Sequence, residues 1–66
     1  MAVLKVIEVL SSSKESWEDA TKKAVAQASK TVKNIRSVYV QDQSATVKDG
    51  NITEFRVNLK LSFEIE

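Results

Sequence analysis

The sequence of 66 residues contains no cysteine, no histidine and no proline, and its only glycine is Gly50. Without cysteine and histidine the chain can form neither a disulfide nor a structural zinc site. The same absence removes the usual nucleophile–base pairs of covalent catalysis, and a single glycine cannot make a glycine-rich phosphate loop. We therefore expect a protein that is not an enzyme and that has no histidine-based pH switch near neutrality.

The chain is also short, which limits its hydrophobic core. A chain of about this length buries only roughly 60% of the surface that its unfolded form exposes. One such core supplies only about 3–5 kcal/mol of stability. We expect a single domain over residues 1–66, stabilised further by self-association because disulfides and zinc are absent.

Charges of both signs are present and interleaved. Ten basic and nine acidic residues leave a net charge of +1, without the clustered basic surface that nucleic-acid binding needs. The N-terminal segment lacks a basic region before its apolar run, and no apolar stretch approaches the roughly 18 residues of a membrane span. These features predict no nucleic-acid partner, no membrane partner and a cytoplasmic location.

The last part of the chain has the clearest pattern. From residue 55 onward the odd positions are apolar and the even positions are polar. The odd set comprises Phe55, Val57, Leu59, Leu61, Phe63 and Ile65. A strict period of two predicts a strand with one buried face and one solvent face. Any contact of this strand with a ligand must therefore come from the even positions.

The first half of the chain predicts a strand followed by a helix. Residues 2–10 are rich in Val, Leu and Ile on both faces of a strand. The serine triplet 11–13 should end this strand and cap a helix, with Ser12 and Glu15 at the spacing of a capping box and Ser13 with Ser16 as a weaker option. A narrow, alanine-rich apolar stripe then predicts a helix over residues 14–33 that packs closely on the sheet.

The middle of the chain predicts a second strand and a hairpin. Residues 36–48 are extended in character, but the apolar phase changes near residues 41–44, which indicates a bulge or bend. Asp49-Gly50 then predicts a tight hairpin turn into the last strand. The predicted fold class is α+β: a β-α-β-β chain whose three-stranded antiparallel sheet wraps around one helix.

This order and several local sequences resemble the dodecin family, over essentially the whole chain. The segments that carry the resemblance are the opening strand 3–9, the serine break before residues 16–18, the helix end 32–35, the turn 49–50 and the final run 55–63. The resemblance implies a non-enzymatic binding or storage protein that assembles as a hollow homododecamer. It also implies sequestration of a flavin, FMN or riboflavin, between tryptophans, with a glutamine on the last strand binding the edge of the ring.

Two positions of this sequence depart from that pattern. Ser37 stands where flavin-binding dodecins have the stacking tryptophan, and Arg56 stands where they have the glutamine. Serine offers no stacking surface, and arginine donates hydrogen bonds but accepts none. Tyr39, two residues further along the same strand face, partly replaces the aromatic wall, whereas Trp17 belongs to the helix stripe. The resemblance thus implies a weakened or altered flavin site formed by Ser37, Tyr39 and Arg56.

Two alternatives remain open beside a flavin, and the first is a dodecin-like assembly whose ligand is a cation or another small anion. Arg56 could accept a phosphate or a carboxylate bidentately. In a symmetric shell, carboxylates from several subunits can converge on a hard cation such as calcium. The candidate ligands for such a metal site are Asp42, Glu54 and Glu64, with Asp49 as a further candidate. The other alternative is a purely structural oligomer that has no specific ligand.

Overall fold

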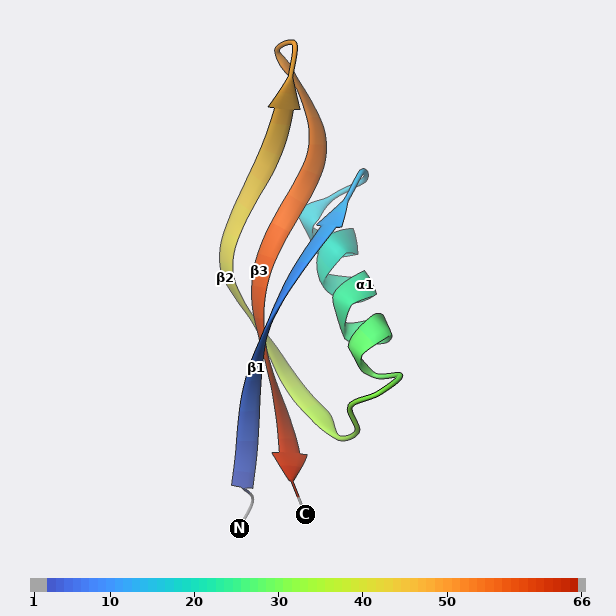
Figure 1. Ribbon diagram of the computed structural model, residues 1–66, viewed down its shortest axis with the longest axis vertical. Coiled ribbons are helices and arrows are strands. Elements are labelled where there is room, and N and C mark those ends of the chain that lie inside the picture. Colours follow the sequence, from blue (N-terminus) through green and yellow to red (C-terminus); the bar gives the residue numbers. More distant parts are fainter. Residues whose placement is uncertain (1–2, 66) are drawn as a thin grey trace.

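The computed structural model describes residues 3–65 as a three-stranded antiparallel sheet with one helix against one of its faces (Figure 1). The elements are β1 (Val3–Ser13), α1 (Trp17–Ala28), β2 (Ile35–Lys48) and β3 (Asn51–Ile65). The strand order is β1-β3-β2, so β3 is the central strand and pairs with both others. The predicted α+β class and β-α-β-β order are confirmed.

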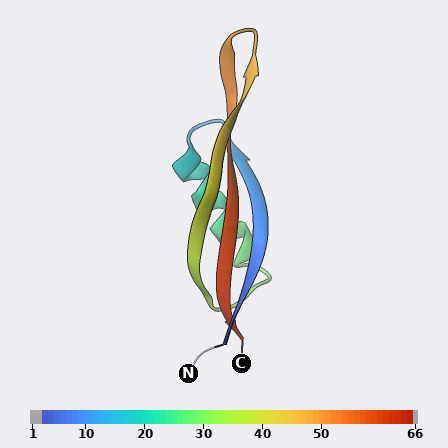
Figure 2. The same ribbon diagram turned by 90° about the vertical axis from the view of Figure 1, so that its left-hand side faces the viewer.

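The central strand β3 separates a buried face from a solvent face. Val57, Leu59 and Leu61 are almost completely buried, and α1 covers this face of the sheet. We call it the helix face. The even residues of β3 lie on the opposite side, the outer face, which Figure 2 views directly, with α1 behind the strands. The period of two in the sequence is therefore the period of burial, although Ile65 at the end of the strand is 47% exposed.

The helix is shorter than predicted. It begins at Trp17 and ends at Ala28, instead of covering residues 14–33. Its alanine stripe packs closely as expected, with Ala20 fully buried and Ala24 6% exposed. After Ala28 the N–H groups of Lys30 and Thr31 donate to carbonyls three residues back, and that of Val32 donates to the carbonyl of Ala28. The β-branched Thr31 and Val32 have low helix propensity, which favours an end to the helix here.

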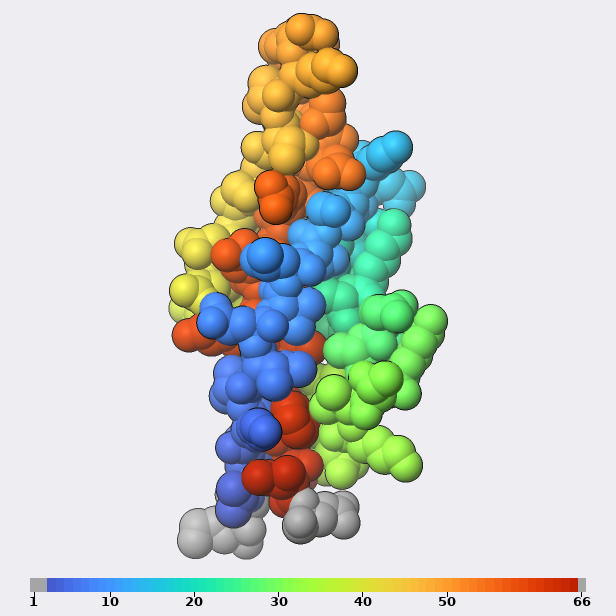
Figure 3. Space-filling model, viewed as in Figure 1, coloured from blue at the N-terminus to red at the C-terminus, as the bar shows by residue number. Residues whose placement is uncertain are grey.

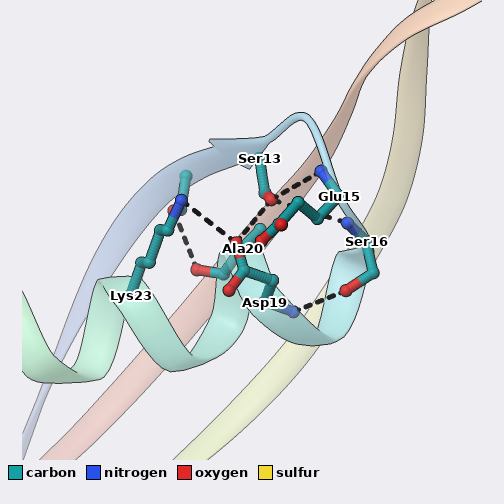
Figure 4. A network of polar contacts seen from close by, with 7 residues as sticks. Ser13, Glu15, Ser16, Asp19, Ala20 and Lys23 are labelled. Atoms are coloured by element: carbon teal, nitrogen blue, oxygen red, sulfur yellow. Dashed lines mark hydrogen bonds and ion pairs between the residues drawn. The ribbon is translucent and has the colours of Figure 1, made fainter.

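The serine triplet does not end the first strand, so this prediction was wrong. Ser11, Ser12 and Ser13 continue β1 and pair with Val57, Arg56 and Phe55 of β3. The hydroxyls of Ser11 and Ser13 reach the helix. Ser11 donates to the carbonyl of Ala20 at 2.8 Å, and Ser13 donates to Asp19 at 2.6 Å (Figure 4). Serine is compatible with this strand end because α1 accepts these hydrogen bonds.

The predicted cap residue was also wrong. Ser16, not Ser12, is the N-cap of α1, and its hydroxyl accepts a hydrogen bond from the backbone N–H of Asp19 at 2.9 Å. Ser13 supports the same turn, because its Oγ accepts from the backbone N–H of Glu15 at 2.9 Å (Figure 4). A buried serine at the end of β1 thus joins the strand to the start of the helix.

Asp19 makes the stability of this junction dependent on pH. The hydrogen bond from Ser13, and then that from Lys23, hold the pKa of Asp19 below its ordinary value of 3.8. Because the folded-state pKa is the lower one, the stabilisation is complete above the unfolded-state pKa and is lost as the pH falls through the folded-state pKa. In the parent chain the free energy of unfolding should therefore decrease as the pH is lowered below about 4, and in Asp19→Asn we expect this decrease to be smaller.

Urea unfolding at several pH values measures this effect. The matched control is Glu18→Gln, which also removes an acid that pairs with a lysine four residues later. Glu18 accepts no hydrogen bond from a serine among residues 3–65. The free energy of unfolding of Glu18→Gln should therefore depend on pH as steeply as that of the parent chain. An unchanged slope in Asp19→Asn would contradict the assigned role of the Ser13–Asp19 contact.

The hairpin between β2 and β3 forms where predicted. Asp49 and Gly50 both adopt positive φ, 52° and 78°, as the two central residues of a tight hairpin turn do. The strand register shifts between Val40 and Asp42, which confirms the irregularity expected near residues 41–44. The hairpin extends past the end of β1, and the molecule measures 50 × 20 × 13 Å (Figure 1).

Apolar side chains occupy the outer face of β1. Leu4, Val6 and Leu10 are 52%, 55% and 68% exposed. The sequence predicted a first strand that is apolar on both faces, and the structure confirms it. In residues 3–65 we find no helix with the length and apolar character that crossing a membrane requires.

Candidate functional site

The three predicted flavin-contacting residues lie on the outer face of the sheet. In the strand register Ser37 is opposite Ser62, Tyr39 is opposite Lys60, and Ser44 is opposite Arg56. Paired residues in neighbouring strands point to the same side, and the partners in β3 are all at even positions. Ser37, Tyr39 and Arg56 are all exposed, so each is accessible to a ligand in this chain.

One chain brings only two of these residues together. Ser37 and Tyr39 are neighbours on one strand face, about 7 Å apart along β2. Arg56 lies six residues along β3 from the partner of Ser37, a distance of about 20 Å. A ligand the size of a flavin ring that contacts both Ser37 and Arg56 must therefore take one of them from a second copy of the chain.

The predicted metal ligands are spread along the same face. Asp42 is opposite Asn58, Glu54 is opposite Thr46, and Glu64 is opposite Leu4. Glu64 is engaged by Arg36, whose guanidinium lies 2.9 Å from its carboxylate. Within residues 3–65 no three acidic side chains come together to hold a metal ion. A calcium site built from these carboxylates needs more than one copy of the chain.

Arg56 stands at the centre of a polar row across the sheet. Ser12 of β1 and Ser44 of β2 are its partners in register. A pocket of about 160 Å³ opens beside it on β1 and β3. Its lining residues are Leu10, Ser11, Ser12, Arg56, Val57 and Asn58. This pocket lies within one chain, unlike the Ser37–Arg56 combination.

A second, larger groove runs between α1 and the edge strand β1. Its volume is about 550 Å³, and Val9, Ala24 and Ala28 are among its apolar lining residues. Lys23 and Lys30 also line it, from the helix side. Figure 3 views this side of the molecule, with β1 in blue beside the green helix. The groove and the apolar outer residues of β1 thus leave apolar surface exposed along the β1 edge of the sheet.

Comparison with known proteins identifies the family. The family model described as Dodecin matches residues 3–66. The chain belongs to the dodecin family. The "Calcium dodecin" of Mycobacterium tuberculosis is 35% identical over 65 residues, which cover 98% of this chain and 92% of that protein. The "Dodecin" of Thermus thermophilus is 30% identical over 64 residues, covering 97% and 93%.

Solved dodecin structures share the fold. The dodecin of Streptomyces coelicolor matches with a TM-score of 0.93 at 29% identity, covering 98% of this chain and 93% of that chain. The crystal structure of calcium dodecin, described as a calcium-chelating antigen with a novel calcium-binding site, matches with a TM-score of 0.84 at 37% identity and covers 97% and 91%. The predicted resemblance to dodecins is thus confirmed.

Sequence reasoning missed the neighbours of Arg56. Ser12 was interpreted as a helix cap, and neither Leu10 nor Asn58 was considered as a site residue. The period of two places Asn58 beside Arg56 on the outer face, so this part could have been found. The contribution of Leu10 and Ser12 depends on the register between β1 and β3, which the sequence pattern does not specify.

Proposed function

We propose that this protein is a non-enzymatic, self-associating dodecin that sequesters a flavin, FMN or riboflavin, at an altered site on the outer face of its sheet. The single observation that supports this most is the common placement of Ser37, Tyr39 and Arg56 on that face, in a chain of the dodecin family. Tyr39 contributes the aromatic surface, and Arg56 contributes donors only. A site with one tyrosine in place of tryptophan binds the ring weakly.

Self-association into a homododecamer is part of this proposal. Only five hydrophobic residues are buried in the described chain, two of which are alanines. Leu4 and Val6 on the outer face of β1 stay exposed, and β1 and β2 both have an unpaired edge in a single chain. Burial of such surfaces between copies supplies stability that one small core lacks. The separation of Ser37 from Arg56 also requires a second copy to complete the flavin site.

Flavin titration tests the proposed ligand. We expect the fluorescence of FMN or riboflavin to be quenched on addition of the purified protein, with saturation at a defined ratio to subunits. Light scattering on the same sample should give the mass of twelve chains, and native mass spectrometry should show any flavin that is retained. Unchanged flavin fluorescence at high protein concentration would exclude flavin sequestration. A monomeric mass would exclude the proposed homododecamer.

Calcium is the second candidate, because the calcium dodecin of Mycobacterium tuberculosis is 35% identical to this chain. The proposed ligands are Asp42, Glu54 and Glu64, contributed by more than one copy. Calorimetric titration with calcium after chelation should show saturable heat that Asp42→Asn reduces. If calcium gives no heat of binding with the assembled protein, calcium is excluded as the ligand. If neither flavin nor calcium binds, the remaining candidate is a purely structural oligomer.

A further inference from the structure

We propose that the pocket beside Arg56 binds the phosphate or carboxylate group of a small organic anion, a specificity that deepens the proposed ligand-binding function of the outer face and partly rests on it. The pocket is contained within one chain. Its ligand chemistry follows from the donors that line it, from its size and from the apolar wall at one side.

The guanidinium of Arg56 is available for a ligand. The ion pairs within residues 3–65 join Lys22 to Glu18, Lys23 to Asp19 and Arg36 to Glu64. Arg56 takes part in none of them, whereas Arg36 is already engaged at 2.9 Å. A planar guanidinium with free donors matches a phosphate or carboxylate bidentately.

Two polar side chains beside Arg56 supply further donors. Ser12 is the direct partner of Arg56 in β1, and Asn58 is the next residue of β3 on the same face. Over residues 3–65 neither the Ser12 hydroxyl nor the Asn58 amide is used in a side-chain hydrogen bond. Both line the pocket together with Arg56, so an anion there meets donors from β1 and β3.

The size and the wall of the pocket specify an organic anion. The pocket volume of about 160 Å³ is below the roughly 300–1,000 Å³ of pockets for drug-sized ligands, so it accommodates one anionic group with a small organic substituent. Leu10 lines the pocket and is 68% exposed. Apolar atoms of a ligand that cover Leu10 gain roughly 25 cal/mol for each Å² removed from water.

Nearby acids weaken this site without cancelling it. Asp42 lies diagonally across the sheet from Arg56, and Glu54 lies two residues away on β3. Diagonal neighbours are about 7–8 Å apart, close to the Debye length of about 8 Å at physiological ionic strength. Their repulsion of an anion is therefore only partly screened, whereas the hydrogen bonds from Arg56 to the anion are direct. Neutralising Asp42 should raise the affinity for the anion.

Calorimetry of the full-length protein with three small probes tests the site. Phenyl phosphate and benzoate, which differ only in the anionic group, should bind, and neutral phenol should not. We expect Arg56→Gln to lower the affinity for phenyl phosphate about tenfold or more, since charge-assisted hydrogen bonds are lost. The affinity of Arg56→Lys for phenyl phosphate should lie between those of the parent chain and Arg56→Gln. Lysine keeps the positive charge but lacks the planar, two-pronged guanidinium.

Arg36→Gln is the matched control. It removes the same charge from the sheet, but Arg36 is held by Glu64 and lies outside the pocket. Its affinity for phenyl phosphate should equal that of the parent chain. Equal loss in both variants would indicate an effect of net charge alone and would overturn the site, as would absence of binding by both anions.

Flavin titrations of the same samples separate this proposal from the flavin proposal. If neither FMN nor riboflavin is quenched while phenyl phosphate binds in an Arg56-dependent way, the flavin function fails and the anion site stands. If the flavins are quenched but the anions do not bind through Arg56, the anion site is overturned and the flavin function stands. Circular dichroism of each variant checks that it is folded.

Discussion

Replacement of Leu61 by alanine is expected to destabilise the protein by about 2–5 kcal/mol. Leu61 is fully buried at the centre of the sheet, opposite Ile7 on β1 and Val38 on β2. The truncation removes transfer free energy and leaves a cavity between these side chains. A single core of this size supplies only about 3–5 kcal/mol, so the variant should be largely unfolded unless assembly compensates.

Chemical denaturation followed by the fluorescence of the single tryptophan, Trp17, measures this loss. The matched control is Leu4→Ala, on the outer face of β1, where the side chain is 52% exposed. Within one chain it should change stability by no more than about 0.5 kcal/mol. A larger effect should be accompanied by a lower assembly mass, because it would indicate that a neighbouring copy covers Leu4. If Leu61→Ala and Leu4→Ala lose equal stability and the mass of the assembly does not change, the assignment of Leu61 to the core is contradicted.

Replacement of Ser37 by tryptophan is expected to raise the affinity for FMN and riboflavin at least about tenfold. Ser37 is exposed on the outer face, where its hydroxyl contacts that of Ser62. We expect a tryptophan at this position to stack on the flavin, because the resemblance to flavin-binding dodecins implies that their stacking residue stands here. Aromatic stacking contributes about 0.5–1.5 kcal/mol beyond the burial of apolar area, and the indole adds that burial as well.

Quenching of flavin fluorescence measures the gain. Ser29→Trp is the matched control, because Ser29 is also an exposed serine but follows α1, on the other side of the sheet from Ser37. It adds a tryptophan without adding a stacking surface near Tyr39, so the affinity should not change. An equal gain in both variants would mean nonspecific binding to exposed indole. No gain in Ser37→Trp would mean that the pocket differs from that of flavin-binding dodecins at more than this one residue.

Most of the fold could be predicted from local patterns. The alternation in β3, the alanine stripe of α1 and the Asp49-Gly50 turn each concern near neighbours in the chain, and each is confirmed. The errors lie at the ends of elements. Ser11 to Ser13 were expected to leave the strand, but hydrogen bonds to the helix and pairing with β3 keep them in it. Tertiary contacts outweigh the local preference of serine for caps and turns.

The candidate site was less predictable than the fold. The sequence pattern correctly placed Arg56 and the other even-numbered residues of β3 on the outer face. The register between β2 and β3 places Ser37, Tyr39 and Asp42 on the same face. The distances between them could not be predicted, because the bulge between Val40 and Asp42 and the pairing of β2 with β3 decide which rows they occupy. A site that contains both Ser37 and Arg56 therefore requires a second copy of the chain.

The sequence by itself determined the elements, their order and the two faces of β3, because these follow from side-chain periodicity along one segment. Only the tertiary structure decided that Ser12, Arg56 and Ser44 form one row across three strands and that Arg56 has no acidic partner within residues 3–65. The physical reason is that register arises from contacts between segments far apart in the chain. A shift of a single residue would have brought different side chains to Arg56.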